Sequence, residues 1–505
     1  MDPDGQFTVS KDKIILYNKG QMAGHLTKNR TKLFLSLFAI SLLFIYLRVR
    51  TVGHLLMWDE AWNILSLRAF VLDAVNDPFY WFYNFHPPLY MLFARALNPL
   101  GQGIDIRLEW LSLIISYGCF LVTFILAARI GGWRLASLSG LFLGVMPCSI
   151  AYDTWIKGDN LASLFGYSAI FLLIRKNYFW CAILLSFSFL SKENAFFFAL
   201  AVFGLLFLLK VEKPILKAVL ISLVIIALSS WWYILTGSSW QKIYDFYFST
   251  NIYKDIWTNP PIYYLKKLIL DLSPPQLVLF LAGFGYFCYK AAVHREKRWL
   301  VPVFIFLCVY VPISLLIKTK TPWLVISAKP AMAMITGGGI LYFFKLSKKM
   351  KIFPYITAIF MAIAVFSGFD FSYSGYHEIT YPNGWPGALA SRKLAYYLNE
   401  NMKKDDKLLI TQFSYWKMPT CPIFLYYWDR HPISVLGENK NADQVIQEIK
   451  EKEISWFALV DSPDPTYNLH TLAQEMNGRF SKPPAIVGWS YVWETQELFA
   501  EETKR

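Results

Sequence analysis

Leu33–Leu47 reads LFLSLFAISLLFIYL, an apolar run without a charged residue near the start of the chain. Similar apolar runs follow at Leu111–Ala128 and Ile215–Leu235. A helix rises ~1.5 Å per residue, so about 20 apolar residues span the ~30 Å hydrocarbon core of a bilayer. These runs therefore predict membrane-spanning helices.

The composition of the whole chain agrees with this prediction. Of the 505 residues, 55% are hydrophobic and 17% are charged, and the mean hydropathy is +0.36. A soluble domain contains roughly 45–50% apolar and about 25% charged residues. We therefore exclude the soluble enzyme classes and expect an α-helical polytopic membrane protein of about eleven transmembrane helices over residues 33–371.

The charges divide unevenly between the membrane part and the tail. The formal net charge is +14, but residues 372–505 hold 14 Lys and Arg against 17 Asp and Glu, which leaves +17 on residues 1–371. Cytoplasmic loops are enriched in Lys and Arg. Sorting the short loops by this rule places residues 1–32 in the cytoplasm and the tail outside a plasma membrane. The basic balance thus reflects topology and does not indicate a nucleic-acid partner.

Three longer segments are expected on the outer side, namely 51–107, 236–275 and the tail 372–505. The tail alternates amphipathic helical patterns with short strand patterns. The predicted helices are 388–401 and 443–451, and the predicted strands are 407–411 and 455–460. This pattern predicts a small C-terminal extracytoplasmic α/β domain.

Two adjacent carboxylates follow the first apolar run, in Met57-Trp58-Asp59-Glu60-Ala61-Trp62. A charge at membrane depth costs at least ~2.5–3.5 kcal/mol, so each one requires a reason. A carboxylate pair at a membrane surface is suited to proton abstraction, with Asp59 as the base and Glu60 as its neighbour. The alternative is that both acids only stabilise the first turn of a helix.

His86 stands before a double proline, Pro87-Pro88, that ends any preceding helix. An imidazole presented there can hydrogen-bond a phosphate, although an ordinary interfacial turn explains the same residues. Further along, Asp153 and Lys157 are four residues apart, which allows an ion pair if this segment is helical. That pair would leave Asp159, at the start of the next span, unexplained.

Two further outer connections carry lysines on the side where the charge rule disfavours them. They are Ser191-Lys192-Glu193 and Lys318-Thr319-Lys320-Thr321-Pro322-Trp323. Such lysines can hold an anionic lipid head group. Acids that accept a proton and cations that hold an anion together fit group transfer from a lipid-linked phosphate to a hydroxyl.

This set of motifs resembles the GT-C glycosyltransferases, in the branch of protein O-mannosyltransferases and lipid A aminoarabinose transferases. The resemblance covers about residues 33–343 and consists of five elements in chain order. They are an acidic pair (Asp59, Glu60), an [HK]PPL element (86–89), an Asp that opens a span (Asp159), an [ST]KE element (191–193) and a KxP[WY] element (320–323).

The resemblance implies a polyprenyl- or dolichyl-phosphate sugar as donor and an inverting transfer to a hydroxyl of a protein, lipid or glycan. It implies Asp59 as general base beside Glu60, and donor-phosphate contacts from His86, Lys192 and Lys320. The residues that would position groups in the cavity are Asp153, Lys157, Asp159, Glu193 and Trp323. Aminoarabinose transferases have a metal-binding acid directly before their KPPL-type element, whereas this chain has Phe85, so we assign no metal or other cofactor.

A transporter or flippase of lipids or lipid-linked sugars is the main alternative, because intramembrane charges also line permeation paths. It predicts inverted repeats and helices broken near mid-membrane, neither of which is evident in the sequence. A scaffold that only displays the tail is a third reading, and it leaves the outer lysines without a role.

Overall fold

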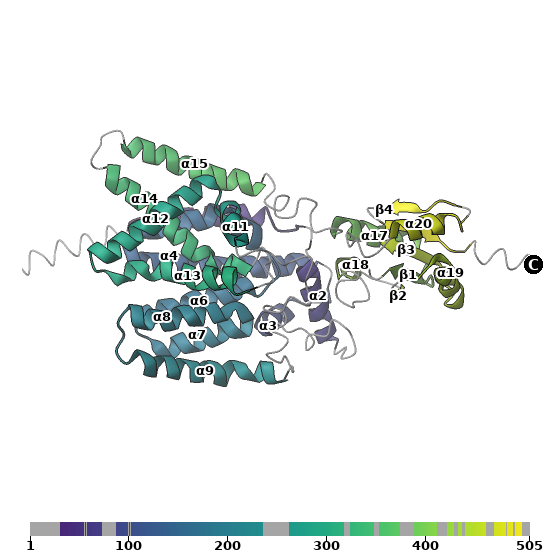
Figure 1. Ribbon diagram of the computed structural model, residues 1–505, viewed down its shortest axis with the longest axis horizontal. Coiled ribbons are helices and arrows are strands. Elements are labelled where there is room, and N and C mark those ends of the chain that lie inside the picture. Colours follow the sequence, from purple (N-terminus) through teal and green to yellow (C-terminus); the bar gives the residue numbers. More distant parts are fainter. Residues whose placement is uncertain are drawn as a thin grey trace, which may run out of the picture. The chain divides into compact units, whose positions relative to one another are not determined.

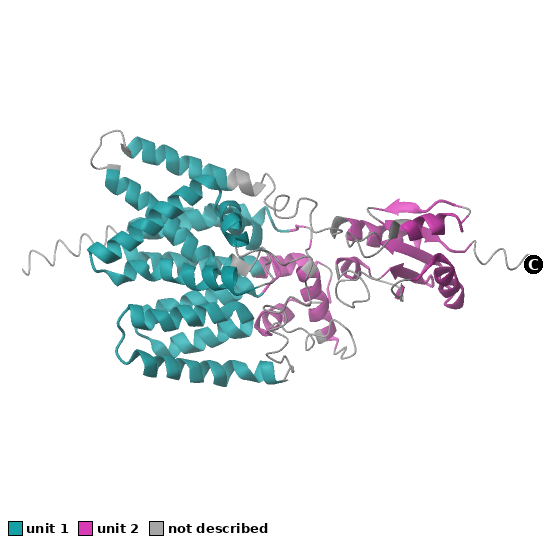
Figure 2. Cartoon of the chain, viewed as in Figure 1, with its two compact units in different colours: residues 1–52, 112–154, 158–376 teal, residues 53–111, 155–157, 377–505 magenta. Residues whose placement is uncertain are grey.

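The computed structural model describes residues 31–72 except 55 and 57, 87–235 except 99 and 102, 262–317, 324–347, 353–373, 388–411, 422–428, 433–436, 440–460, 469–480, 482–487 and 490–496. The chain forms two compact units, coloured separately in Figure 2. Unit 1 comprises residues 1–52, 112–154 and 158–376, and unit 2 comprises 53–111, 155–157 and 377–505.

Unit 1 is helical (Figure 1). It contains the helix Thr31–Val49, most of α4 (Ile104–Val145), α5 (Pro147–Tyr152), α6 (Asp159–Ile174), α7 (Tyr178–Ser191), α8 (Phe196–Leu208), α9 (Pro214–Leu235), α11 (Tyr263–Leu272), α12 (Pro274–Val293), α13 (Val301–Leu315), α14 (Lys329–Ser347) and α15 (Phe353–Tyr373). Short 3₁₀ turns η2 (Glu193–Ala195), η3 (Lys297–Leu300) and η4 (Leu324–Ala328) join some of them. In α4, Gly132 breaks the helix with a φ of 76°, a backbone conformation that suits glycine.

Several of these helices have the length and composition of membrane spans. Among the described residues, five helices are long and apolar enough to cross a bilayer: Thr31–Val49, Ile104–Val145, Pro214–Ile234, Pro274–Val293 and Lys297–Leu315. On α9, large side chains such as Ile215, Leu220 and Ile226 face outward. A lipid environment accounts for so many exposed apolar groups. The chain is thus an integral membrane protein, as predicted, while the number of about eleven spans stays a prediction.

Helices α12 and α14 approach each other closely through glycines. A Cβ built on Gly283 would lie 1.8 Å from the Ile335 carbonyl oxygen, and one built on Gly339 would lie 2.1 Å from the Leu279 carbonyl oxygen. Small residues let two helix backbones meet, which is the usual basis of helix association where no water is present to drive it.

Unit 2 contains a five-stranded sheet built from the tail. The strand order is β2-β1-β3-β5-β4, with β1 (Leu408–Thr411) parallel to both β2 (Ile433–Leu436) and β3 (Trp456–Val460). The strands β4 (Ala485–Val487) and β5 (Ser490–Glu494) continue it in antiparallel pairing. The predicted α/β domain is therefore confirmed.

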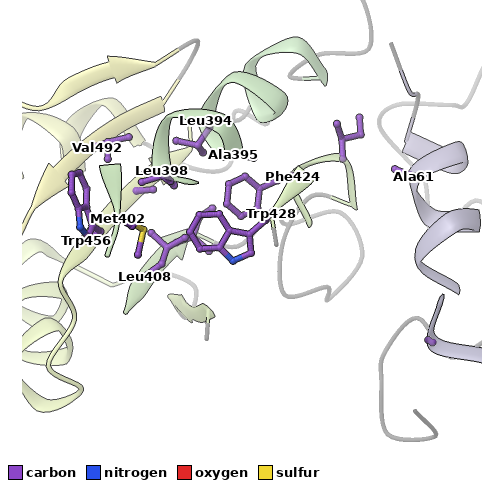
Figure 3. Close-up of a cluster of buried hydrophobic side chains, with 14 residues drawn as sticks. Ala61, Leu394, Ala395, Leu398, Met402, Leu408, Phe424, Trp428, Trp456 and Val492 are labelled. Atoms are coloured by element: carbon purple, nitrogen blue, oxygen red, sulfur yellow. The ribbon is translucent and has the colours of Figure 1, made fainter. Parts of the chain in front are cut away.

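Helices cover both faces of this sheet. On one face, α17 (Ala388–Asn401) and α18 (Pro422–Tyr427) pack Leu394, Leu398 and Phe424 into a core with the sheet residues Leu408 and Trp456 (Figure 3). On the other face, α19 (Ala442–Glu451) and α20 (Leu469–Asn477) form a second core. The alternation of side chains along each strand supplies both cores.

Unit 2 also contains α2 (Trp58–Val71) and α3 (Leu89–Arg95) from the segment after the first helix. The buried Ala61 and Ala69 of α2 belong to the same core as α18. The Arg68 guanidinium lies over the Tyr426 ring, 4.9 Å from its centroid. Burial and the neighbouring Asp105 carboxylate both raise the pKa of the Tyr426 phenol, so this residue stays a neutral hydrogen-bond donor. The helix that carries Asp59 and Glu60 is thus packed on the C-terminal domain.

The close approach of α12 and α14 makes a testable prediction. We expect Gly283→Ala to lower the melting temperature of the detergent-solubilised protein, because the added methyl group collides with backbone atoms that cannot move aside. Gly285→Ala on the same helix is the matched control: a Cβ there has nothing within 4 Å, so the melting temperature should hold or rise slightly. Equal melting of the two variants would contradict the packing.

Candidate active site

The first turn of α2 carries Asp59 and Glu60. Consecutive residues of a helix point about 100° apart, so the two carboxylates face different surroundings. The Glu60 side chain is fully buried, whereas 39% of the Asp59 side chain is exposed. The Glu60 carboxylate therefore lies in the protein interior, whereas the Asp59 carboxylate is partly exposed.

Glu60 is anchored by two neighbours in unit 2. The His54 Nε2 atom lies 3.0 Å from Glu60 Oε2, and the backbone N–H of Ile156 donates to Glu60 Oε1 at 2.9 Å. Both contacts favour the ionised carboxylate. Glu60 thereby ties the start of α2 to the segment 155–157.

That segment is held at two more points. Asn63, one turn further along α2, donates through Nδ2 to the Ile156 carbonyl at 2.7 Å. The Lys157 ammonium is 2.6 Å from Asp59 Oδ2 and 4.8 Å from the centroid of the Trp155 ring. Only 6% of the Lys157 side chain is exposed, so water screens its charge less than that of a surface lysine. The partly exposed Asp59 carboxylate can accept a further hydrogen bond, while Lys157 fixes its orientation.

The predicted ion pair between Asp153 and Lys157 is wrong. Residues 153–158 form turns and bends between α5 and α6, and the helical spacing on which the pair depended is absent there. Lys157 pairs with Asp59, while Asp153 pairs with Arg48 Nε at 2.9 Å and with Lys329 Nζ at 2.5 Å.

Asp153, Arg48 and Lys329 form a buried cluster in unit 1 with two cations and one anion. Arg48 is fully buried and also donates to the carbonyls of Leu143 and Gly144 near the end of α4. Lys329 also donates to Asn160 Oδ1 at 3.1 Å. Neither Arg48 nor Lys329 was among the predicted site residues, although both lie within residues 33–371, which are predicted to hold the membrane spans. A charge in such a stretch is the signal that would have identified them.

Asp159 begins α6 and belongs to a second polar network in unit 1. Its Oδ1 accepts from Asn194 Nδ2 at 2.9 Å, and the same amide is 3.3 Å from Ser327 Oγ. Lys192, whose backbone is extended at the end of α7, lies 3.7 Å from Glu193 through Nζ and Oε1. All of these side chains are buried or nearly so.

The predicted residues therefore fall into two groups. Unit 2 brings Asp59, Glu60 and Lys157 together, and unit 1 contains Asp153, Asp159, Lys192 and Glu193. His86, Lys320, Pro322 and Trp323 lie outside the described residues. The helix α3 begins at Leu89, directly after the double proline. Within the described part of the chain, no group of three or more His, Cys, Asp or Glu could hold a metal ion.

No protein-family model and no curated protein sequence matches the chain. Solved structures do resemble it. ArnT from Cupriavidus metallidurans bound to undecaprenyl phosphate aligns with a TM-score of 0.61 and 15% identity, over 91% of this chain and 97% of that one. Archaeal oligosaccharyltransferase AglB from Archaeoglobus fulgidus, in complex with an inhibitory peptide and a dolichol-phosphate, aligns with a TM-score of 0.56 and 10% identity, over 86% of this chain and 69% of that one.

Both neighbours belong to the GT-C superfamily. The chain therefore shares the fold of these two proteins, as the resemblance of its motifs implied, with a small C-terminal sheet domain.

The buried cluster in unit 1 gives the second prediction. Asp153→Asn removes the only carboxylate among the partners described for this cluster and leaves Arg48 and Lys329 close together. Breaking a buried ion pair from one side costs about 3–5 kcal/mol, so we expect a large fall in melting temperature. Lys329→Met, which leaves the Arg48–Asp153 pair intact, should cost less. A melting curve of Asp153→Asn that matches the wild type would show that Asp153 does not stabilise the buried charges of Arg48 and Lys329.

Proposed function

We propose that this protein is a membrane glycosyltransferase that moves a sugar from a polyprenyl- or dolichyl-phosphate donor to an acceptor hydroxyl on the outer face of the membrane. The single observation that carries the proposal is the first turn of α2 within a GT-C fold. It buries Glu60 as an anchor and exposes Asp59 beside Lys157.

The proposed reaction is a single inverting displacement with Asp59 as general base. The acceptor hydroxyl oxygen attacks the anomeric carbon while the bond from that carbon to the phosphate oxygen breaks. The hydroxyl proton passes to the Asp59 carboxylate, and the polyprenyl phosphate leaves. Lys157, 2.6 Å from Asp59, holds the carboxylate ionised and oriented before the proton arrives.

The leaving phosphate requires positive charge rather than a general acid, because its oxygen departs as a weakly basic anion. We assign this role to His86, Lys192 and Lys320, and we assign Asp153, Asp159, Glu193 and Trp323 to shaping the cavity. The donor class is supported by the two neighbours, which were obtained with undecaprenyl phosphate and with a dolichol-phosphate. Both ligands are lipid phosphates.

The orientation of the chain follows from its charges. The basic short loops favour a cytoplasmic N-terminus, and they place residues 372–505 and the first turn of α2 outside. The C-terminal domain shares a core with α2, so we assign it to the acceptor side of the reaction. The proposed acceptor is a hydroxyl of a protein, lipid or glycan.

Replacing the Asp59 carboxylate by an amide tests its proposed role as general base. Purified Asp59→Asn protein, supplied with polyprenyl-phosphate mannose or aminoarabinose and with membranes of a deletion strain as acceptor, should transfer sugar roughly 10²–10⁴ times more slowly than the wild type. Its affinity for the donor should hold, because Asp59 acts on the acceptor. Asp443→Asn, on the exposed surface of α19, is the control and should transfer normally.

Full transfer by Asp59→Asn would remove Asp59 from the role of base. Movement of a fluorescent lipid phosphate across proteoliposomes, without sugar transfer to any acceptor, would favour the flippase and overturn the proposed reaction.

A further inference from the structure

His54 lies between two buried carboxylates that come from different helices. Its Nε2 atom is 3.0 Å from Glu60 Oε2 on α2, and its Nδ1 atom is 3.3 Å from Glu109 Oε1 on α4. Both carboxylates are at most 1% exposed. The proposed reaction uses neither His54 nor Glu109, and no motif of the sequence analysis included them.

The backbone around His54 is shaped for this contact. The chain turns at residues 50–53 after the first helix, and Gly53 has a φ of 85° in the left-handed region. The Gly53 N–H donates to the Glu109 carboxylate, so the residue before His54 is fixed to the same acid. A side chain at position 53 would strain this conformation. The imidazole is therefore positioned from its own backbone as well as by its two partners.

Charge balance favours the protonated form of His54. Two carboxylates buried without compensation would be strongly unfavourable. An imidazolium donates from both ring nitrogens, one to each carboxylate, and so compensates the pair far better than a neutral ring with a single N–H. Among the described residues, the neighbouring charged groups include Asp59 and Lys157, which pair with each other, and Asp105, whose carboxylate repels that of Glu109.

We propose that His54 and Glu109 are positioning residues that hold Glu60 ionised and anchored, so that the first turn of α2 presents Asp59 to the acceptor. The inference rests on the proposed function, since it concerns how the base is placed. Glu60 transmits the effect because it also accepts the Ile156 N–H, next to the Lys157 that pairs with Asp59. Loss of the imidazolium proton weakens the contact to Glu60 and loosens this arrangement.

The pH dependence of transfer tests this positioning. Wild-type activity should fall on the alkaline side as His54 loses its proton. Glu109→Gln keeps the shape of the side chain but removes one negative charge, so the imidazolium loses its proton at lower pH and the alkaline limb should move down by about one pH unit. His54→Gln should remove that limb and lower kcat roughly ten- to a hundredfold, with the donor KM unchanged.

His294→Gln is the matched control, because His294 is exposed at the end of α12 and should leave the alkaline limb in place. A merely structural role predicts a different result: Glu109→Gln would lower activity and melting temperature together, with the alkaline limb where the wild type has it. That outcome would overturn the inference.

A second measurement separates this inference from the proposed function. The ¹⁵N chemical shifts of the imidazoles report protonation without any transfer reaction, and the chain has seven histidines, so the His54 signal can be assigned by its loss in His54→Gln. Its titration midpoint should move to lower pH in Glu109→Gln. Failure of transfer in wild-type protein would refute the proposed function, whereas an unmoved His54 midpoint would refute the link between His54 and Glu109.

Discussion

The cost of burying a charge determines how this molecule is built around its polar residues. A charged side chain in an apolar bundle is tolerated only with a close partner of opposite sign and with its remaining hydrogen-bonding groups satisfied. In unit 1, Asp153 meets this requirement between Arg48 and Lys329. In unit 2, Glu60 meets it through His54 and the Ile156 N–H. Each group joins segments that are distant in sequence, so the same requirement also fixes how the segments meet.

The first turn of α2 shows how buried partners determine the position of a side chain. Two neighbouring acids have different surroundings because one side chain points inward and the other outward. Glu60 is held by its partners, and the Asp59 side chain is 39% exposed beside a cation. In the proposed reaction, proton transfer would benefit from this arrangement, since a base whose position is set before substrate arrives needs no reorganisation. The core shared by α2 and α18 adds a second constraint, from the C-terminal domain.

Elements with a strong periodic pattern were predictable. The amphipathic helix 388–401 corresponds to α17, and the predicted strands 407–411 and 455–460 correspond to β1 and β3. The strands β2 and β4 were not predicted. In the structure β2 pairs with β1 and β4 pairs with β5, which are contacts that the local sequence does not encode. The acids of α2 were likewise found from the sequence, while His54, which contacts Glu60, and Glu109, which contacts His54, were not.

The sequence alone determined that the chain enters a membrane, that a small α/β domain follows the helices, and that the acidic pair Asp59 and Glu60 follows the first span. These conclusions rest on hydropathy, periodicity and adjacency, which are local properties of the chain. Only the tertiary structure decided the pairing of the charges. Arg48 and Asp153 are 105 residues apart, and Asp153 and Lys329 are 176 apart. The partner of a buried charge is set by which segments pack together, and spacing along the chain, as the failed Asp153–Lys157 pair shows, does not predict it.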